Sequence, residues 1–161
     1  MRFHGLVLVA AVAALSACGG GGETANTDTT ATAGTATTPA AGAATGTAAP
    51  VTGTMHEVKM IGDEKGYRFE PVDITIKAGD GIKWVMVSGG PHNVQFQNIA
   101  ADVKTQLSAN MPNQLSDLSS PMLINPNETY EISFANVKAG KYEYVCTPHL
   151  ANNMRGSVTV Q

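Results

Sequence analysis

Three side chains that bind soft metals lie within nine residues near the C-terminus, in the stretch CTPHLANNM from Cys146 to Met154. Cys146 offers a thiol, His149 an imidazole and Met154 a thioether. Such a donor set favours copper, and a His₂Cys plane with a distant axial methionine is typical of electron-transfer copper sites. For Cys146 taken alone, the alternative interpretation is a buried and chemically inert cysteine.

A site of this kind needs a second histidine from elsewhere in the chain. His4 lies in the N-terminal segment, and His56 begins an expected strand beside charged residues, where we expect it to be solvated. His92 lies in SGGPHNVQF, after a Gly-Gly-Pro turn and before an expected strand, where a loop can present a side chain. His92 is therefore the candidate, and an exposed turn histidine is the alternative.

The motifs PHNVQF and CTPHLANNM together resemble the plastocyanin and pseudoazurin branch of the cupredoxins, the blue (type 1) copper proteins, over about residues 55–161. The resemblance implies an electron carrier, not an enzyme. It implies one type 1 copper ion with four protein ligands, which are His92, Cys146 and His149 in the equatorial plane and Met154 in the axial position. It also implies that Asn93 braces the Cys146 loop by hydrogen bonding near Thr147, as residues around a metal site hold its ligands in place.

The elements that must position these residues are short strands. From residue 55 onward, alternating runs separated by turn residues predict an antiparallel sandwich or barrel of about seven or eight strands. The runs are HEVKMIG, VDITIKAGD, GIKWVMV, NVQFQ, ETYEISF, GKYEYVC and RGSVTV, and in the third the side chains of Ile82, Trp84 and Met86 are expected on one face. The resemblance implies an all-β, cupredoxin-like Greek-key β-sandwich. Ile99, Val103 and Leu107 recur every four residues and predict one short surface helix after Asn98. The role of residues 100–121 is not assigned.

Composition limits the classes of function. The 161 residues allow one domain, and a net charge of -3 gives no basic surface for nucleic acid. Two cysteines exclude a disulfide framework. The expected domain holds eleven of the 13 carboxylates and nine of the 10 Lys and Arg residues, because Glu23, Asp28 and Arg2 lie before it. These charges are scattered and form no concentrated acidic patch.

The N-terminal third predicts attachment to a membrane. Residues 1–17 are typical of a signal peptide, with Arg2 before the apolar run from Leu6 to Leu15, and LSAC resembles the bacterial lipobox with Cys18 as the acylated residue. Residues 18–54 are rich in Thr, Ala and Gly and predict a disordered, lipid-anchored linker. Residues 55–161 form the expected copper-binding domain, held on the periplasmic side of a bacterial membrane.

The function that follows is a membrane-tethered copper carrier. We expect a monomeric head domain that cycles between Cu(I) and Cu(II) and exchanges electrons with redox proteins such as a cytochrome or a membrane oxidoreductase. His149, between Pro148 and Leu150, is expected to emerge through an apolar surface beside residues 89–91 and to provide the exit route. The alternative is an extracytoplasmic copper chaperone or storage protein. A structural zinc site is disfavoured by the thioether.

Overall fold

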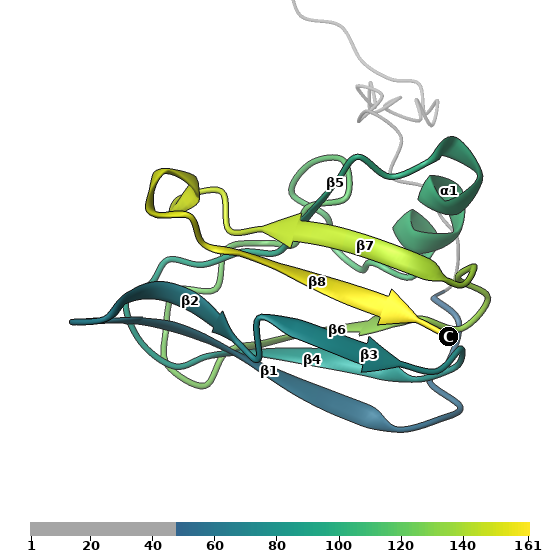
Figure 1. The fold of residues 1–161 in the computed structure, drawn as a ribbon, viewed down its shortest axis with the longest axis horizontal. Coiled ribbons are helices and arrows are strands. Elements are labelled where there is room, and N and C mark those ends of the chain that lie inside the picture. Colours follow the sequence, from purple (N-terminus) through teal and green to yellow (C-terminus); the bar gives the residue numbers. More distant parts are fainter. Residues whose placement is uncertain (1–47) are drawn as a thin grey trace, which may run out of the picture. The chain divides into compact units, whose positions relative to one another are not determined.

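The computed structural model describes residues 48–161. The expected signal peptide, Cys18 and most of the expected linker lie outside the described residues. Eight strands form two four-stranded sheets that pack face to face, with one short helix beside the second sheet (Figure 1). The predicted all-β sandwich with one short helix is confirmed.

The first sheet contains, in spatial order, β2 (Gly66–Glu70), β1 (Met55–Asp63), β4 (Gly81–Met86) and β6 (Thr129–Ser133). The second contains β3 (Asp73–Ile76), β8 (Arg155–Val160), β7 (Gly140–Val145) and β5 (Gln95–Gln97). The helix α1 (Ala101–Ala109) follows β5, and a 3₁₀ turn, η1 (Leu150–Asn152), precedes β8.

Both sheets are mixed, whereas the alternating pattern predicted antiparallel pairing. β1 runs parallel to β4, and β3 runs parallel to β8. The chain between β1 and β4 first forms β2 and then crosses to the other sheet as β3, so β4 re-enters the first sheet in the direction of β1. Parallel neighbours require such a crossover, because a tight hairpin reverses the chain. β2 was not among the expected strands.

The core contains the side chains that the alternation assigned to it. Ile82, Trp84 and Met86 are all buried on the inner face of β4. Tyr144 from β7 packs edge-on against Trp84, with ring centroids 5.6 Å apart and an interplanar angle of 87°. Edge-to-face contacts between aromatic rings add to the stability gained from burial. The core therefore fixes β7, and with it Cys146 at the end of that strand.

The helix α1 is held by packing. Its Val103 and Leu107 are buried, as their spacing predicted, while the N-cap Ala100 makes no side-chain capping bond. A nine-residue helix is marginal alone in water, so its apolar face must supply the stability. Among residues 48–161, no helix is long and apolar enough to cross a membrane.

The last residues of the expected linker contact the domain. The amides of Thr52 and Gly53 both donate to the Gly79 carbonyl at 2.9 Å, and the Thr54 amide donates to Asp80 Oδ1 at 2.8 Å. Asp80 Oδ2 is also hydrogen-bonded to His56 Nε2 at 2.9 Å, so His56 is held against the domain and is not simply solvated. These contacts lie where β1 and β4 begin. The domain boundary at residue 54 remains a prediction.

Candidate metal centre

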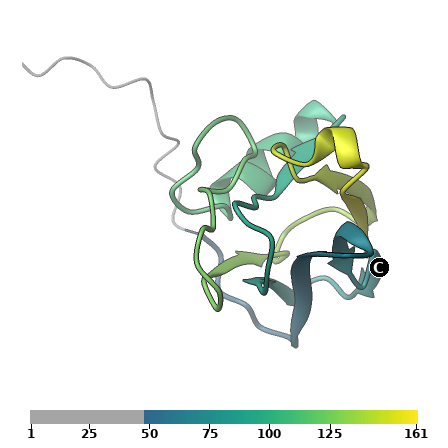
Figure 2. The same cartoon turned by 90° about the vertical axis from the view of Figure 1, so that its left-hand side faces the viewer.

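The loops at one end of the sandwich bring together three of the predicted site residues. His92 lies between β4 and β5, Cys146 follows β7, and His149 follows three residues later. One donor atom from each lies within 4.8 Å of the others. Cys146 Sγ is 3.5 Å from His92 Nδ1 and 3.4 Å from His149 Nδ1, and the two Nδ1 atoms are 3.2 Å apart. Figure 2 looks onto this end and shows the loops gathered over it.

The orientation of the His92 ring is fixed from outside the cluster. Its Nε2 donates to the Ser88 carbonyl at 2.9 Å. A carbonyl oxygen only accepts, so Nε2 carries the proton and the lone pair of Nδ1 faces Cys146. Burial lowers the pKa of His92, which favours the neutral ring. A neutral imidazole whose other nitrogen is hydrogen-bonded is the usual form of a histidine ligand.

Cys146 is fully buried at the end of β7, and burial raises the pKa of its thiol. Metal binding must therefore release the thiol proton, because the thiolate is the ligand form. The loop that follows is tight: the His149 amide donates to the Cys146 carbonyl at 3.2 Å, and the Cys146 amide donates to the Met154 carbonyl at 3.0 Å. Burial lowers the pKa of His149, and the neighbouring His92 lowers it further.

Met154 is fully buried in the same loop, and its amide donates to the His149 carbonyl at 3.2 Å. Asn153 before it takes a left-handed conformation with φ 58°, which ends η1 and turns the chain into β8. The loop thus returns Met154 to the site end of the sandwich. Its role as an axial ligand remains a proposal.

Asn93 links the two loops that carry the candidate ligands. Its Oδ1 accepts hydrogen bonds from the Thr147 amide at 2.7 Å and from Thr147 Oγ1 at 3.0 Å. Asn93 is 1% exposed, so these bonds form away from solvent. This is the contact near Thr147 that the family resemblance implied. It ties the residue after His92 to the residue after Cys146.

The β1–β2 hairpin supplies two contacts that the sequence does not predict. The ring of Tyr67 stacks on His149, with centroids 3.7 Å apart and an interplanar angle of 12°. His149 is consequently only 8% exposed and does not emerge freely through the surface as expected. The Ser88 carbonyl that orients His92 also accepts from the Gly62 amide at 2.8 Å. One hairpin therefore contacts His149 directly and also the carbonyl that supports His92.

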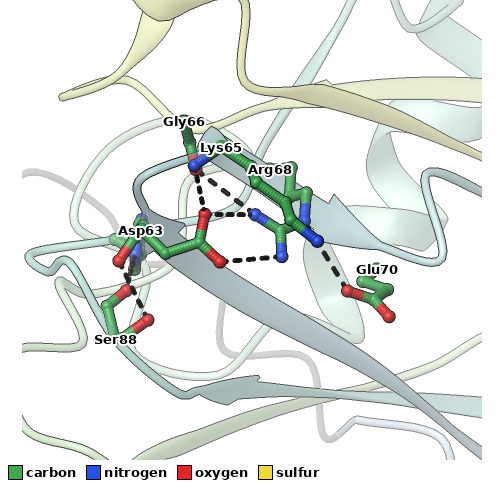
Figure 3. A network of polar contacts seen from close by, with 8 residues as sticks. Asp63, Lys65, Gly66, Arg68, Glu70 and Ser88 are labelled. Atoms are coloured by element: carbon green, nitrogen blue, oxygen red, sulfur yellow. Dashed lines mark hydrogen bonds and ion pairs between the residues drawn. The ribbon is translucent and has the colours of Figure 1, made fainter.

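An ion-pair network stiffens this hairpin (Figure 3). Both carboxylate oxygens of Asp63 bind Arg68, at 2.8 and 3.0 Å, and Asp63 Oδ1 also accepts from the Lys65 amide. The hydrogen bond from Arg68 lowers the pKa of Asp63. Gly89, with φ 73°, lies so close to Gly62 that a Cβ atom there would be 2.4 Å from the Gly62 Cα. The hairpin and the His92 loop thus meet backbone to backbone.

The donor set fits copper. The cluster found among the described residues offers two imidazole nitrogens and one sulfur, with no carboxylate oxygen. Thiolate and imidazole ligands select thiophilic or borderline metals, whereas Ca²⁺ and Mg²⁺ require oxygen ligands. Burial of all three side chains excludes bulk water from the cluster.

Comparisons with known proteins identify the family. Residues 56–161 match the family described as "Copper binding proteins, plastocyanin/azurin family". The chain belongs to this family. It is 36% identical over 105 residues to the plastocyanin of Scenedesmus fuscus, an alignment that covers 65% of this chain and 97% of that protein. It is 31% identical over 115 residues to the plastocyanin of Prochlorothrix hollandica, with 71% and 79% covered.

A third relative is longer. The chloroplastic plastocyanin of Physcomitrium patens is 38% identical over 106 residues, and the chain spans 56% of its length. Among solved structures, the oxidised plastocyanin of Dryopteris crassirhizoma matches with a TM-score of 0.52 and 28% identity, covering 65% of this chain and 99% of that one. The cupredoxin fold inferred from the sequence is confirmed, and with it copper as the cofactor. Plastocyanin-like cupredoxins carry electrons, so copper electron transfer is the general function of this family member.

Proposed function

We propose that the protein is a lipid-tethered, type 1 copper electron carrier that shuttles electrons between redox proteins on the periplasmic side of a bacterial membrane. Copper, when bound, supplies a one-electron Cu(II)/Cu(I) couple. His92, Cys146 and His149 are the proposed equatorial ligands, and Met154 is the proposed axial ligand. The partners are of the class of a cytochrome or a membrane oxidoreductase, and the head domain acts as a monomer.

One observation carries the proposal: three buried donor atoms of a His₂Cys set lie within 4.8 Å of one another. Each proposed equatorial ligand has a support outside the site. Ser88 holds the His92 ring, Asn93 holds the Cys146 loop, and Tyr67 covers the His149 ring. A site held this way limits the movement that accompanies a change of oxidation state, which suits electron transfer better than substrate binding.

Part of the surface around the site, beside the charged β1–β2 hairpin, suits docking with an uncharged partner face. Three segments meet there, residues 84–101, 118–127 and 144–154, and none contains Asp, Glu, Lys or Arg. Backbone hydrogen bonds between His92 and Leu123 join the first two segments. Val87 and Leu150 are 40% and 43% exposed on these loops, and Ile124 is 63% exposed. Apolar surface of this kind, with few charges, is typical of the centre of protein interfaces.

The proposed tether leaves the domain away from this surface. Residues 52–54 are hydrogen-bonded at the start of β1 and β4, whereas the site lies beyond the other ends of β4 and β7 (Figure 1). Acyl chains on Cys18 would hold the protein on the membrane, since two or more chains give stable anchoring. A linker joined at that end leaves the docking surface free to meet partners.

The decisive experiment is a visible spectrum of the copper-loaded, oxidised protein beside that of the Cys146→Ser variant. We expect an intense thiolate-to-copper band in the wild type and none in the variant. The variant's thermal stabilisation by Cu(II) should also fall, because a ligand stabilises the native state according to its affinity. A wild-type protein that binds copper at full occupancy without colour would reject the carrier and support a copper chaperone.

A further inference from the structure

The segment between β5 and β6, whose role the sequence did not assign, carries two buried serines. Ser119 is 2% exposed and Ser120 is fully buried. A buried hydroxyl without a hydrogen-bond partner costs free energy. The partners of these two serines therefore show which part of the chain the segment holds in place. Both serines bond to the chain just after His92.

Ser120 fixes the backbone of the segment. Its hydroxyl accepts from the Val94 amide at 2.9 Å and donates to the Pro121 carbonyl at 2.8 Å. Its own amide donates to the Val94 carbonyl at 2.9 Å. These three bonds hold the segment against the residues that lead into β5, independently of the neighbouring Ser119 side chain.

The Ser119 hydroxyl has a different partner. Asn93 Nδ2 donates to Ser119 Oγ at 3.1 Å, and Ser119 Oγ donates to the Ser120 carbonyl at 3.2 Å. The other end of the Asn93 amide, Oδ1, holds the amide and the hydroxyl of Thr147. Both Thr147 groups are donors in this contact, so the oxygen of Asn93 must face Thr147 and its nitrogen must face Ser119.

The position of Ser119 is fixed in turn by hydrogen bonds that connect its loop to the end of α1. Gln114 Oε1 accepts from the Leu118 amide at 2.9 Å, and Gln114 Nε2 donates to the Ser108 carbonyl at 3.0 Å near the end of α1. Leu118 is buried in the core with Leu107 of the helix. The helix and its following loop thus present one hydroxyl to Asn93.

We propose that Ser119 is a positioning residue for the copper site, acting through Asn93 on the loop that begins at Cys146. The proposal rests on the proposed function, in which Cys146 is a copper ligand. Without the Ser119 hydroxyl, the buried Nδ2 of Asn93 has no partner among the described residues. The amide then gains by rotating toward another acceptor, which loosens its bonds to Thr147 and the geometry of the adjacent thiolate.

The test compares Ser119→Ala with Ser116→Ala in the full-length protein. Ser116 is exposed in the same loop and contributes only its backbone to the hydrogen bonds found in the described residues. We expect Ser119→Ala to weaken Cu(II) binding about tenfold in a competition titration, since residues supporting metal ligands typically contribute 10–100-fold. We also expect the thiolate-to-copper band of Ser119→Ala to shift. Ser119→Thr, which keeps a hydroxyl, should retain the wild-type Cu(II) affinity and band. Ser116→Ala should match the wild type.

A double-mutant cycle with Thr147→Val separates positioning from general destabilisation. Ser119 and Thr147 both bond to Asn93, so we expect their effects on Cu(II) affinity to be less than additive. Strict additivity, or a Ser119→Ala protein that melts earlier when metal-free but keeps wild-type affinity and colour, would overturn the proposal. Failure of the wild type to bind copper with a thiolate band would instead reject the proposed function.

Discussion

The stack of Tyr67 on His149 leads to a quantitative prediction for the reduction potential. The two rings are nearly parallel, at 3.7 Å between centroids, and one of them belongs to a proposed copper ligand. Cu(II) withdraws more electron density from an imidazole than Cu(I) does. An electron-rich phenol ring therefore stabilises the oxidised site more than the reduced one, and its removal should raise the potential.

The size of the effect is limited by the energy of the contact. Aromatic pairs contribute about 0.5–1.5 kcal/mol beyond the burial of their surface. For a one-electron couple, a tenfold change in the equilibrium corresponds to about 59 mV. If the whole contact energy favoured Cu(II), its loss would raise the potential by about 20–65 mV. We expect Tyr67→Leu to approach the lower end of this range.

Leucine is the informative replacement because it keeps an apolar side chain over His149. Alanine would admit water, which stabilises the more highly charged Cu(II) site and opposes the effect of losing the ring. Tyr67→Phe is the matched control, since it preserves the stacked ring and removes only the hydroxyl, and its potential should move less than half as far. Voltammetry of the three copper-loaded proteins measures the shifts, and their visible spectra show whether the site is intact. A Tyr67→Leu potential equal to or below that of the wild type would refute the reasoning.

Three further predictions concern Asp80, Met154 and Cys18. The backbone hydrogen bond from Lys77, the bond to His56 and the backbone hydrogen bond from Thr54 lower the pKa of Asp80 from 3.8 to about 2. The ionised form of Asp80 therefore stabilises the fold above about pH 4, and this contribution is lost as the pH falls toward 2. Asp80→Asn should flatten the dependence of Tm on pH in that window, whereas Glu57→Gln, an exposed change on β1, should not. Met154→Gln should lower the potential and Met154→Leu should raise it, each by about 59 mV or more, and unchanged potentials in voltammetry would remove Met154 from the ligand set. Cys18→Ala should release the protein from the membrane fraction and leave its copper spectrum unaltered, and a variant that still pellets after a high-salt wash would contradict lipidation.

The parts of the fold that the sequence predicted are those with a clear periodicity. Ile82, Trp84 and Met86 alternate with partly exposed residues, and burial on one face of β4 follows from the two-residue repeat of a strand. Val103 and Leu107 are four apart, the spacing of one face of a helix. In such segments the local spacing of apolar residues is enough to predict which side chains are buried.

β2 and the parallel pairing were missed for a different reason. β2 has only five residues, and its inward pair, Tyr67 and Phe69, is flanked by the charged side chains of the hairpin. Whether two strands run parallel depends on which sheet the intervening chain joins, and no local pattern records that choice. The alternation of Tyr67 and Phe69 around Arg68 was the available signal for this strand.

The candidate site also has a part that the sequence predicts, the metal donors, and a part that it does not, the residues that support them. The donors could be found from the sequence because few residue types bind copper and because Cys146 and His149 are close along the chain. Apart from Asn93, which the family resemblance implied, their supports could not be found, since a serine hydroxyl or a backbone carbonyl looks the same in the sequence whether it is buried or exposed. Ser119 is 26 residues from Asn93, and Tyr67 is 82 residues from His149, so only the folded chain brings each pair together.

These supports explain how a flexible loop can carry a rigid site. Each proposed equatorial ligand is restrained by a residue outside the donor cluster: His92 by the Ser88 carbonyl of its own loop, Cys146 through Asn93 and Thr147, and His149 by Tyr67. The Ser88 carbonyl and Tyr67 both belong to the junction with the β1–β2 hairpin, which the Asp63–Arg68 ion pair stiffens. Movement of one histidine away from the thiolate therefore requires movement of the hairpin, and with it the other histidine. Because Cu(I) and Cu(II) prefer different geometries, a frame that resists such movement lowers the rearrangement needed at each electron transfer.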